Sequence, residues 1–302
     1  MKYSDNTLLN WCKPASKTED EKINNSIKMI KDAISKSDEL NELDIEVFVQ
    51  GSYANNTNVR INSDVDVCIM LKSTFFPDYA NGMTQEDYGF TDGTITFDDY
   101  KSRVLRALQS KFGFDDVKVG NKSFIIASNS YHVSADAVAT LMLKDFNAIN
   151  SRDSLKYIEG TRFFSKDGEK ISNYPKEHIR NGIEKNNQTN RFYKRLVRIM
   201  KRIRNNMMTD DLINGDIITS FLVECLIWNT PNKIILEYDS WNETIKQAII
   251  YLYNAIKENK HKEWGEVSER LYLFRGRKWT DSDVKDFMVK MWNYLEYDNE
   301  GN

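Results

Sequence analysis

Cysteine and histidine are scarce in this chain of 302 residues, which contains three of each. The cysteines Cys12, Cys68 and Cys225 lie far apart and form no Cys-x-x-Cys pair, and the histidines are equally scattered. Structural zinc sites and disulfide frameworks need such residues at close, regular spacings. The sequence therefore excludes a zinc module and a disulfide-stabilised scaffold.

Proline and glycine are also few, with four and thirteen residues. No repeat or low-complexity tract interrupts the chain, so we expect long regular elements instead of Pro/Gly-rich linkers. Hydrophobic residues make up 40% and charged residues 29% of the sequence, as in ordinary globular proteins. A chain of this length buries a substantial core, either as one large domain or as two closely packed lobes.

Long apolar runs are missing as well. No stretch approaches the ~18 consecutive apolar residues of a membrane-spanning helix. The first residues, MKYSDNTLLNW, do not resemble a signal peptide. We expect a cytoplasmic protein that has no membrane partner.

An excess of basic residues is absent too. The 42 Lys and Arg residues are balanced by 45 Asp and Glu residues, which gives a formal net charge of −3. Proteins that bind long nucleic acids through the phosphate backbone usually carry a clear basic excess. The composition disfavours a protein whose whole surface binds nucleic acid, although a local basic patch is compatible with it.

Hydrophobic periodicity divides the chain into two halves. In the first half, helical spacing over residues 19–37 and 99–112 is mixed with alternating patterns that are typical of strands. The predicted strands cover residues 45–49, 65–71, 117–119, 123–127 and 132–139, and residues 51–63 form a loop or a short helix. From about residue 175 only helical spacing recurs, as in Phe192, Leu196, Ile199, Ile203 and Met207. These patterns predict an α+β first half and a helical second half.

Two aspartates stand one residue apart where a strand pattern begins, in Asp64-Val65-Asp66-Val67. Side chains two positions apart in a strand project from the same face, so the carboxylates point together and the valines face the core. Such close like charges repel unless a cation lies between them. Mg²⁺ is a hard cation that prefers oxygen ligands. For an isolated Asp-x-Asp, two solvent-facing acids of an edge strand are the simpler interpretation.

Two further features strengthen the metal-site interpretation. Asp136 lies in another strand pattern, and Gly51-Ser52 follows the strand pattern at residues 45–49. If the strand of Asp136 pairs beside that of Asp66, three carboxylates converge, as two-metal phosphoryl transfer requires. Glycine lets the backbone approach a phosphate closely, and the Ser52 hydroxyl can bind phosphate oxygens. Asp136 taken alone is more typical of a surface acid, but the combination predicts a phosphoryl-transfer site.

The segment GSYANNTNVRINSDVDV resembles the signature of polymerase-beta-like nucleotidyltransferases. With NWCKPASKTEDEK, ISNYPKEHIRNGIEKNNQTNRFYKRLVRIMKRIRN and MWNYL, it is similar more narrowly to the CdnE branch of the bacterial cGAS/DncV-like nucleotidyltransferases. The resemblance implies an α+β nucleotidyltransferase lobe, a mixed sheet with helices, over residues 1–165. A helical lobe over residues 166–302 packs on it, with a long N-terminal helix spanning both lobes and the active site in the cleft.

The resemblance also implies a reaction and its ligands. Members join two ribonucleoside triphosphates into a cyclic dinucleotide, or a larger cyclic oligonucleotide, and release pyrophosphate. The ligands of two magnesium ions, for which Mn²⁺ can substitute, correspond to Asp64, Asp66 and Asp136. Asp136 also corresponds to the group that helps to deprotonate the attacking ribose hydroxyl. Ser52 with its neighbour Gly51 would hold the donor phosphates, with Gln50 close by.

In the helical half, the resemblance assigns triphosphate contacts to Lys201 and Ser220. Lys201 shares a helix face with Lys194, Arg198 and Arg202, and a solvated basic face is the simpler interpretation for most of these four. Ser220 falls in the first turn of a helix, where free N–H groups favour anions. Its plain alternative is a structural role at the start of that helix.

Two positions bear on the bases of the substrates. Phe221 can stack on a base, although its helical spacing fits a core position equally well. Asn173 falls where family members carry a base-reading residue, and an amide offers a donor and an acceptor to a uracil edge. A turn residue before Tyr174-Pro175 is the alternative for Asn173. We therefore expect a uridine-containing product, with UTP, ATP or both as substrates.

The resemblance further implies a role in anti-phage signalling, in which a separate effector protein reads the cyclic product. The animal relative senses DNA through a zinc module and basic surfaces, whereas this chain has no Cys/His cluster and a net negative charge. DNA is therefore not the expected activator, and the enzyme is either active on its own or controlled by a regulatory protein.

Two other classes of function compete with this prediction. An RNA-tailing or protein-modifying nucleotidyltransferase would share the acids, but the acidic composition and the absence of an RNA-binding module disfavour RNA tailing. A non-catalytic nucleotide-binding protein is the second alternative. A degenerate member of this kind is expected to have lost one acid, whereas all three are present.

Overall fold

The central strand of the sheet forms where the sequence is most consistently apolar. In the computed structural model, which describes residues 1–14, 17–59 and 64–299, strand β2 covers Val65–Asp78. Val65, Val67 and Ile69 are fully buried in the main core of the sheet, whereas Cys68 and Met70 are buried on its opposite face. Burial on both faces explains the near-continuous apolar run. The strand continues beyond the predicted residues 65–71, past an irregularity between Leu71 and Phe75.

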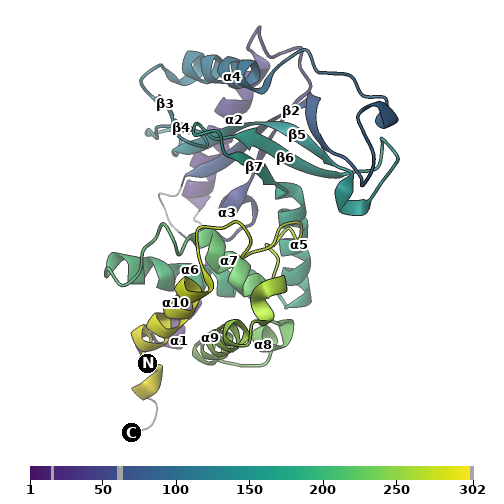
Figure 1. Cartoon of the computed structure of the whole chain (residues 1–302). Helices are drawn as coiled ribbons and strands as arrows, with labels where there is room; N and C mark the ends of the chain where they lie inside the picture. Colours follow the sequence, from purple (N-terminus) through teal and green to yellow (C-terminus); the bar gives the residue numbers. More distant parts are fainter. Residues whose placement is uncertain (15–16, 60–63, 300–302) are drawn as a thin grey trace. The chain divides into compact units, whose positions relative to one another are not determined.

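The sheet is mixed, with the order β1-β2-β5-β4-β3. Figure 1 labels all of its strands except β1. Its central pair, β2 and β5, is parallel, and every other pairing is antiparallel. Strand β4 pairs with the first residues of β5, and β6 pairs with its last residues and with β7. The remaining strands are β1 (Ile45–Val49), β3 (Val117–Val119), β4 (Phe124–Ile126), β5 (Ala135–Asp145), β6 (Ile158–Phe164) and β7 (Lys170–Asn173).

Two amphipathic helices pack on the main core of the sheet. They are α2 (Lys17–Ser35) and α4 (Phe97–Phe112), which contribute Ile30 and Leu108 among their buried residues. The buried Tyr100 of α4 donates a hydrogen bond to the Ile69 carbonyl at 3.0 Å and so ties the helix to β2. Shorter elements complete this part: α3 (Gly51–Ala54), η1 (Glu86–Tyr88) and η2 (Asn147–Ile149). Residues 60–63 of the expected loop after Gly51 lie outside the described residues.

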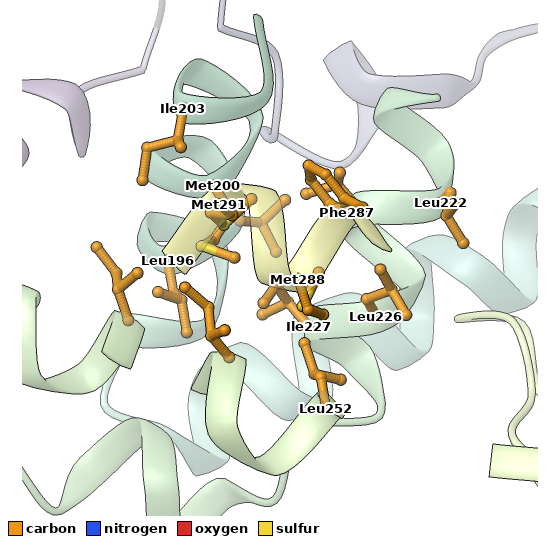
Figure 2. Packing of buried hydrophobic residues seen from close by; sticks show 14 of the residues in the cluster. Leu196, Met200, Ile203, Leu222, Leu226, Ile227, Leu252, Phe287, Met288 and Met291 are labelled. Atoms are coloured by element: carbon orange, nitrogen blue, oxygen red, sulfur yellow. The ribbon is translucent and has the colours of Figure 1, made fainter. Parts of the chain in front are cut away.

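Helices build the rest of the chain around a second core. Figure 2 shows Leu196 and Met200 of α6 packed with Leu226 of α7 and with Met288 and Met291 of α10. The apolar stripe predicted along α6 is buried as expected. The elements are α1 (Asp5–Trp11), α5 (Pro175–Gln188), α6 (Phe192–Thr209), α7 (Ser220–Trp228), α8 (Asn232–Leu236), α9 (Trp241–Lys257), α10 (Asp281–Tyr294), η3 (Lys260–Glu263) and η4 (Tyr297–Asn299).

The contacts divide the chain into two compact units, each taken over its described residues. The sheet unit spans Ala15–Ala54 and Arg60–Lys176, and the helical unit spans Met1–Pro14, Asn55–Val59 and Glu177–Asn302. The predicted α+β class, with a mixed sheet and a C-terminal helical part, is confirmed. The lobe boundary at residue 165 and a helix spanning both lobes stay predictions.

Among the described residues, no helix is both long and apolar enough to cross a membrane.

The predicted strand at residues 132–139 begins later, at Ala135, and runs on to Asp145. The difference arises because pairing with β6 extends the strand through an apolar run that lacks alternation.

Leu226→Ala tests the core of the helical unit. We expect it to lower the free energy of unfolding by about 2–5 kcal/mol, because it leaves a cavity among packed side chains. Leu155→Ala, at a position that is 86% exposed, serves as the control and should change stability by less than about 0.5 kcal/mol. Urea denaturation of both variants measures the difference, and equal losses would contradict the packing shown in Figure 2.

Candidate active site

Two of the predicted acids lie side by side on neighbouring strands. Asp66 of β2 is the register partner of Asp136 of β5, and the flanking Val65 and Ala135 form the preceding pair. Neighbouring strands lie ~4.8 Å apart, so both carboxylates leave the same face at one level of the sheet. Both side chains are half-buried, whereas the valines beside Asp66 are fully buried. The strand pairing on which the predicted site depends is therefore present.

Serine hydroxyls bind two of the three acids. Asp64, exposed just before β2, accepts a hydrogen bond from the Ser134 hydroxyl, and Asp136 Oδ1 accepts one from the Ser123 hydroxyl at 3.0 Å. In the described parts of the chain, no group of three or more His, Cys, Asp or Glu side chains can hold a metal ion as it stands. The donor set fits a hard divalent cation in kind, since it consists of carboxylate oxygens. Each of these two hydrogen bonds uses the Oδ1 atom of its carboxylate, and an ionised carboxylate can accept several contacts.

The electrostatics of Asp136 favour a positive ligand. Burial raises the pKa of Asp136, the negative charge of Asp64 raises it further, and the hydrogen bond from Ser123 opposes both effects. The ionised acids therefore repel each other in a partly desolvated place. A cation beside them would relieve this repulsion.

The Gly-Ser turn abuts the acids directly. The backbone N–H of Gln50 donates to the Asp66 carbonyl at 2.9 Å, and Gly51 and Ser52 open helix α3 immediately afterwards. Gly51 has a φ of +66°, and a Cβ added there would lie 2.1 Å from Asp66 Oδ2. Only glycine permits this approach. The sheet unit thus brings together the predicted residues Gln50, Gly51, Ser52, Asp64, Asp66 and Asp136.

Asn173 lies elsewhere on the sheet. It is the exposed last residue of β7, paired with Thr161, which is in turn paired with Met142 of β5. Strands rise ~3.3 Å per residue, so Met142 and its partners lie roughly 20 Å along β5 from Asp136. The next residue, Tyr174, is buried and donates to Asp145 Oδ2 at 2.5 Å. The structure therefore anchors the end of β7 but does not place Asn173 beside the acids.

The other predicted contacts belong to the helical unit, where Lys201 has an unexpected environment. Its side chain is 3% exposed, and its Nζ donates to Glu224 Oε2 at 2.5 Å and to Thr57 Oγ1 at 3.2 Å. Burial by itself raises the pKa of Glu224, but Lys201 and His178 outweigh it, and the pKa of this carboxyl lies well below its usual range. Lys201 is thus a charged, paired group in the interior of the unit.

The basic face of α6 is not solvated, so that expectation was wrong for Lys194 and Arg198, which are buried. Arg198 donates to the carbonyls of Cys12 at 2.7 Å and Asn56 at 2.5 Å, and burial lowers its pKa to about 10. The prediction of a solvated face was wrong because long basic side chains can donate hydrogen bonds to backbone carbonyls that are remote in sequence. Helical periodicity does not reveal such partners.

Ser220 and Phe221 lie together at the start of α7. Ser220 is its exposed first residue, and the preceding Thr219 caps the helix by accepting a hydrogen bond from the Leu222 N–H. Phe221 is half-buried against the core, and its ring centroid lies 6.1 Å from that of His178. Phe221 therefore has a packing role, whether or not it also contacts a base.

Sequence reasoning missed three residues around Lys201, namely Glu224, Thr57 and His178. Glu224 accepts hydrogen bonds from Thr57 Oγ1 at 2.8 Å and from His178 Nε2 at 3.1 Å, in addition to that from Lys201. One signal was available: a single glutamate interrupts the otherwise apolar helix SFLVECLIW. An acid at such a buried position needs a cationic partner.

A mixed sheet with paired acids on neighbouring strands, beside a Gly-Ser turn, defines a site of the nucleotidyltransferase class. Residues 27–118 match the nucleotidyltransferase domain family, and residues 180–296 match the cGAS/DncV-like nucleotidyltransferase C-terminal helical domain. The cyclic dipyrimidine nucleotide synthase CdnE of Cecembia lonarensis is 46% identical, and the match covers 98% of this chain and 99% of the relative. The chain belongs to the cGAS/DncV-like nucleotidyltransferases, in their CdnE-like branch.

Solved structures agree with this assignment. The CdnE cyclic dinucleotide synthase of Elizabethkingia meningoseptica, with GTP and Apcpp, is 34% identical with a TM-score of 0.82, and the match covers 98% of this chain and 100% of that one. The CdnE c-UMP-AMP synthase of Rhodothermus marinus, with Apcpp and Upnpp, is 26% identical with a TM-score of 0.86, and the match covers 99% of each chain. The predicted family, the nucleotidyltransferase activity and the general function, cyclic dinucleotide synthesis, are confirmed.

Gly51→Ala tests the contact between the Gly-Ser turn and Asp66. The new Cβ collides with the Asp66 carboxylate, and a reacting group displaced by about 1 Å can cost about 10²-fold in rate, which is the expected loss in kcat/KM. Gly82→Ala is the matched control, because Gly82 has a φ of +77° but no atom within 4 Å of an added Cβ. The Gly82→Ala variant should have a similar backbone strain at a positive φ but keep its activity. Steady-state kinetics distinguish the two, and similar losses would mean that backbone strain alone matters.

Lys201→Met tests the buried ion pair. Removing one partner leaves an uncompensated buried charge and should cost about 3–5 kcal/mol of unfolding free energy. The double variant Lys201→Met/Glu224→Leu should recover most of this loss, because an apolar pair of similar volume is often neutral. Lys233→Met removes an exposed partner of Glu237, 4.0 Å away, and should cost at most about 1 kcal/mol. Denaturant unfolding measures all three, and a double variant no more stable than the single one would refute the pairing.

Proposed function

We propose that this nucleotidyltransferase joins two ribonucleoside triphosphates into a uridine-containing cyclic dinucleotide, in two successive steps that each release pyrophosphate. The observation that carries the proposal is the register of Asp66 with Asp136 beside Gly51. It collects negative oxygen ligands next to a turn whose backbone can approach a phosphate. That combination suits attack of a ribose hydroxyl on an α-phosphorus.

Nucleotidyltransferase domains generally use divalent cations, and we assign Asp64, Asp66 and Asp136 as the ligands of two magnesium ions, with Mn²⁺ as a substitute. When bound, such ions offset the charge on the attacking and leaving oxygens. Their charge would also oppose the mutual repulsion that raises the pKa of Asp136.

The chain's own groups have distinct tasks in this mechanism. Asp136 is also assigned the role of accepting the proton of the attacking hydroxyl. Ser52, next to Gln50 and Gly51, donates its hydroxyl hydrogen to donor phosphate oxygens. In the helical unit, Lys201 and Ser220 contribute further phosphate contacts.

The choice of bases rests on Asn173 and on the relatives. An amide can donate to and accept from a uracil edge, and Asn173 is exposed at the end of β7. The Cecembia relative is named a cyclic dipyrimidine synthase and the Rhodothermus relative a c-UMP-AMP synthase, whereas the Elizabethkingia structure contains GTP. We assign UTP as one substrate and UTP or ATP as the other, and Phe221 as a base platform.

The biological setting follows from this product. We propose that the cyclic dinucleotide is an anti-phage messenger that a separate effector protein reads. A regulatory protein, and not DNA, is the proposed controller, since the net charge of −3 disfavours a protein that binds DNA over its whole surface.

Incubation of the purified protein with the four ribonucleoside triphosphates and Mg²⁺ tests the function. We expect mass spectrometry to find a phosphatase-resistant cyclic dinucleotide that contains uridine. Asp66→Asn and Asp136→Asn keep the side-chain size but remove a charge, and each should lower turnover at least about 10³-fold, equivalent to about 4 kcal/mol. Asp167→Asn, at an exposed turn, is the control.

Chelation of divalent cations should also abolish the product. Turnover that survives in the double variant Asp64→Ala/Asp66→Ala would refute the assigned site. A requirement for added RNA, or label found on protein, would instead indicate a tailing or protein-modifying enzyme.

A further inference from the structure

One buried carboxylate connects four parts of the helical unit. Glu224 lies in α7 with its side chain 5% exposed, and it accepts hydrogen bonds from α6, α5 and the segment Asn55–Val59. The donors are Lys201 Nζ at 2.5 Å, His178 Nε2 at 3.1 Å and Thr57 Oγ1 at 2.8 Å. Thr57 itself is completely buried. Glu224 is therefore the centre of a closed polar network.

Among the described residues, Lys201 Nζ has two hydrogen-bond partners, Glu224 and Thr57. An ammonium group has three N–H donors, and contacts to Glu224 and Thr57 use two of them. The third donor would bind a phosphate oxygen through the 3% of the side chain that stays exposed, which leaves the pair intact. Because Glu224 neutralises the charge of Lys201, the lysine would act there as an oriented donor more than as an attractive net charge.

The same carboxylate lies next to the other predicted phosphate and base contacts. Ser220 precedes Glu224 by one helical turn, which puts both on one face of α7. Phe221 lies beside the His178 ring that donates to Glu224. Thr57 follows Ser52 by five residues, and the intervening Asn56 carbonyl accepts a hydrogen bond from Arg198 at 2.5 Å. Displacing the carboxylate would therefore disturb several of these groups together.

We propose that Glu224 is a positioning residue of the triphosphate-binding surface of the helical unit. It holds the Lys201 ammonium, the Thr57 hydroxyl and the His178 ring in the orientation that binds nucleotide. The inference rests on the proposed function, because it takes Lys201 and Ser220 as contacts of a triphosphate. It predicts that loss of the Glu224 charge weakens nucleotide binding even in a protein that stays folded.

Glu224→Gln tests the proposal, because it keeps the shape and an oxygen acceptor but removes the charge. A lysine without a counter-ion in a buried site loses its proton or turns to solvent, and either change removes the oriented donor. We expect KM for the triphosphates to rise about tenfold while kcat stays within about twofold, the signature of lost uniform binding. Calorimetry with a non-hydrolysable UTP analogue should show the same weakening.

Two further variants separate positioning from stability. Glu266→Gln removes another buried glutamate of this unit, which pairs with Arg277 and interacts with His178 through its charge. It should lower the melting temperature and leave KM and analogue affinity unchanged. Thr57→Val removes one hydroxyl from the network and should weaken analogue binding several-fold, and it decides the question if Glu224→Gln does not fold.

The proposal is overturned if folded Glu224→Gln and Thr57→Val bind the analogue within about twofold of the unsubstituted protein, or if Glu266→Gln weakens binding equally. Failure of the proposed function has a different signature. In that case the unsubstituted protein makes no cyclic product, whereas the effects of the variants on analogue binding can still be measured.

Discussion

The parallel pairing of β2 with β5 is the constraint on which the candidate site depends. Their backbone hydrogen bonds set Asp66 opposite Asp136, and a slip of one residue would turn one carboxylate into the core. The buried Val65 and Val67 oppose such a slip, since burying each is worth about 1.5–3 kcal/mol. Apolar side chains that never touch a substrate therefore determine where the acids meet.

This arrangement concentrates like charges, and the surrounding residues moderate their repulsion. Ser123 and Ser134 each donate a hydrogen bond to one of the acids. Burial and Asp64 nevertheless keep the pKa of Asp136 raised. The close approach of Gly51 leaves no space for a side chain at position 51 itself. The local structure thus gathers carboxylates at one place on the sheet, where a cation would relieve their repulsion.

Much of the fold and part of the site could be predicted from the sequence, because both follow from local periodicity. The apolar run located β2, and the two-residue spacing put Asp64 and Asp66 on one face. The local sequence does not show which strand pairs with β2. Only the register of β2 with β5 therefore places Asp136 beside Asp66. The partners of Lys201 were missed for the same reason: Thr57 is 144 residues away along the chain and Glu224 is 23. The burial of Lys194 and Arg198 likewise depends on contacts remote in sequence.

The buried charges of the helical unit are hard to explain by stability alone. Desolvating an ion pair costs about as much as its attraction returns, and well-packed apolar residues often serve equally well. Glu224 and Lys201 are nevertheless buried beside the apolar core of this unit, and the His178 side chain next to them is only 14% exposed. The charges add orientation: each hydrogen bond to Glu224 fixes the direction in which its donor points, whereas apolar packing does not orient polar groups.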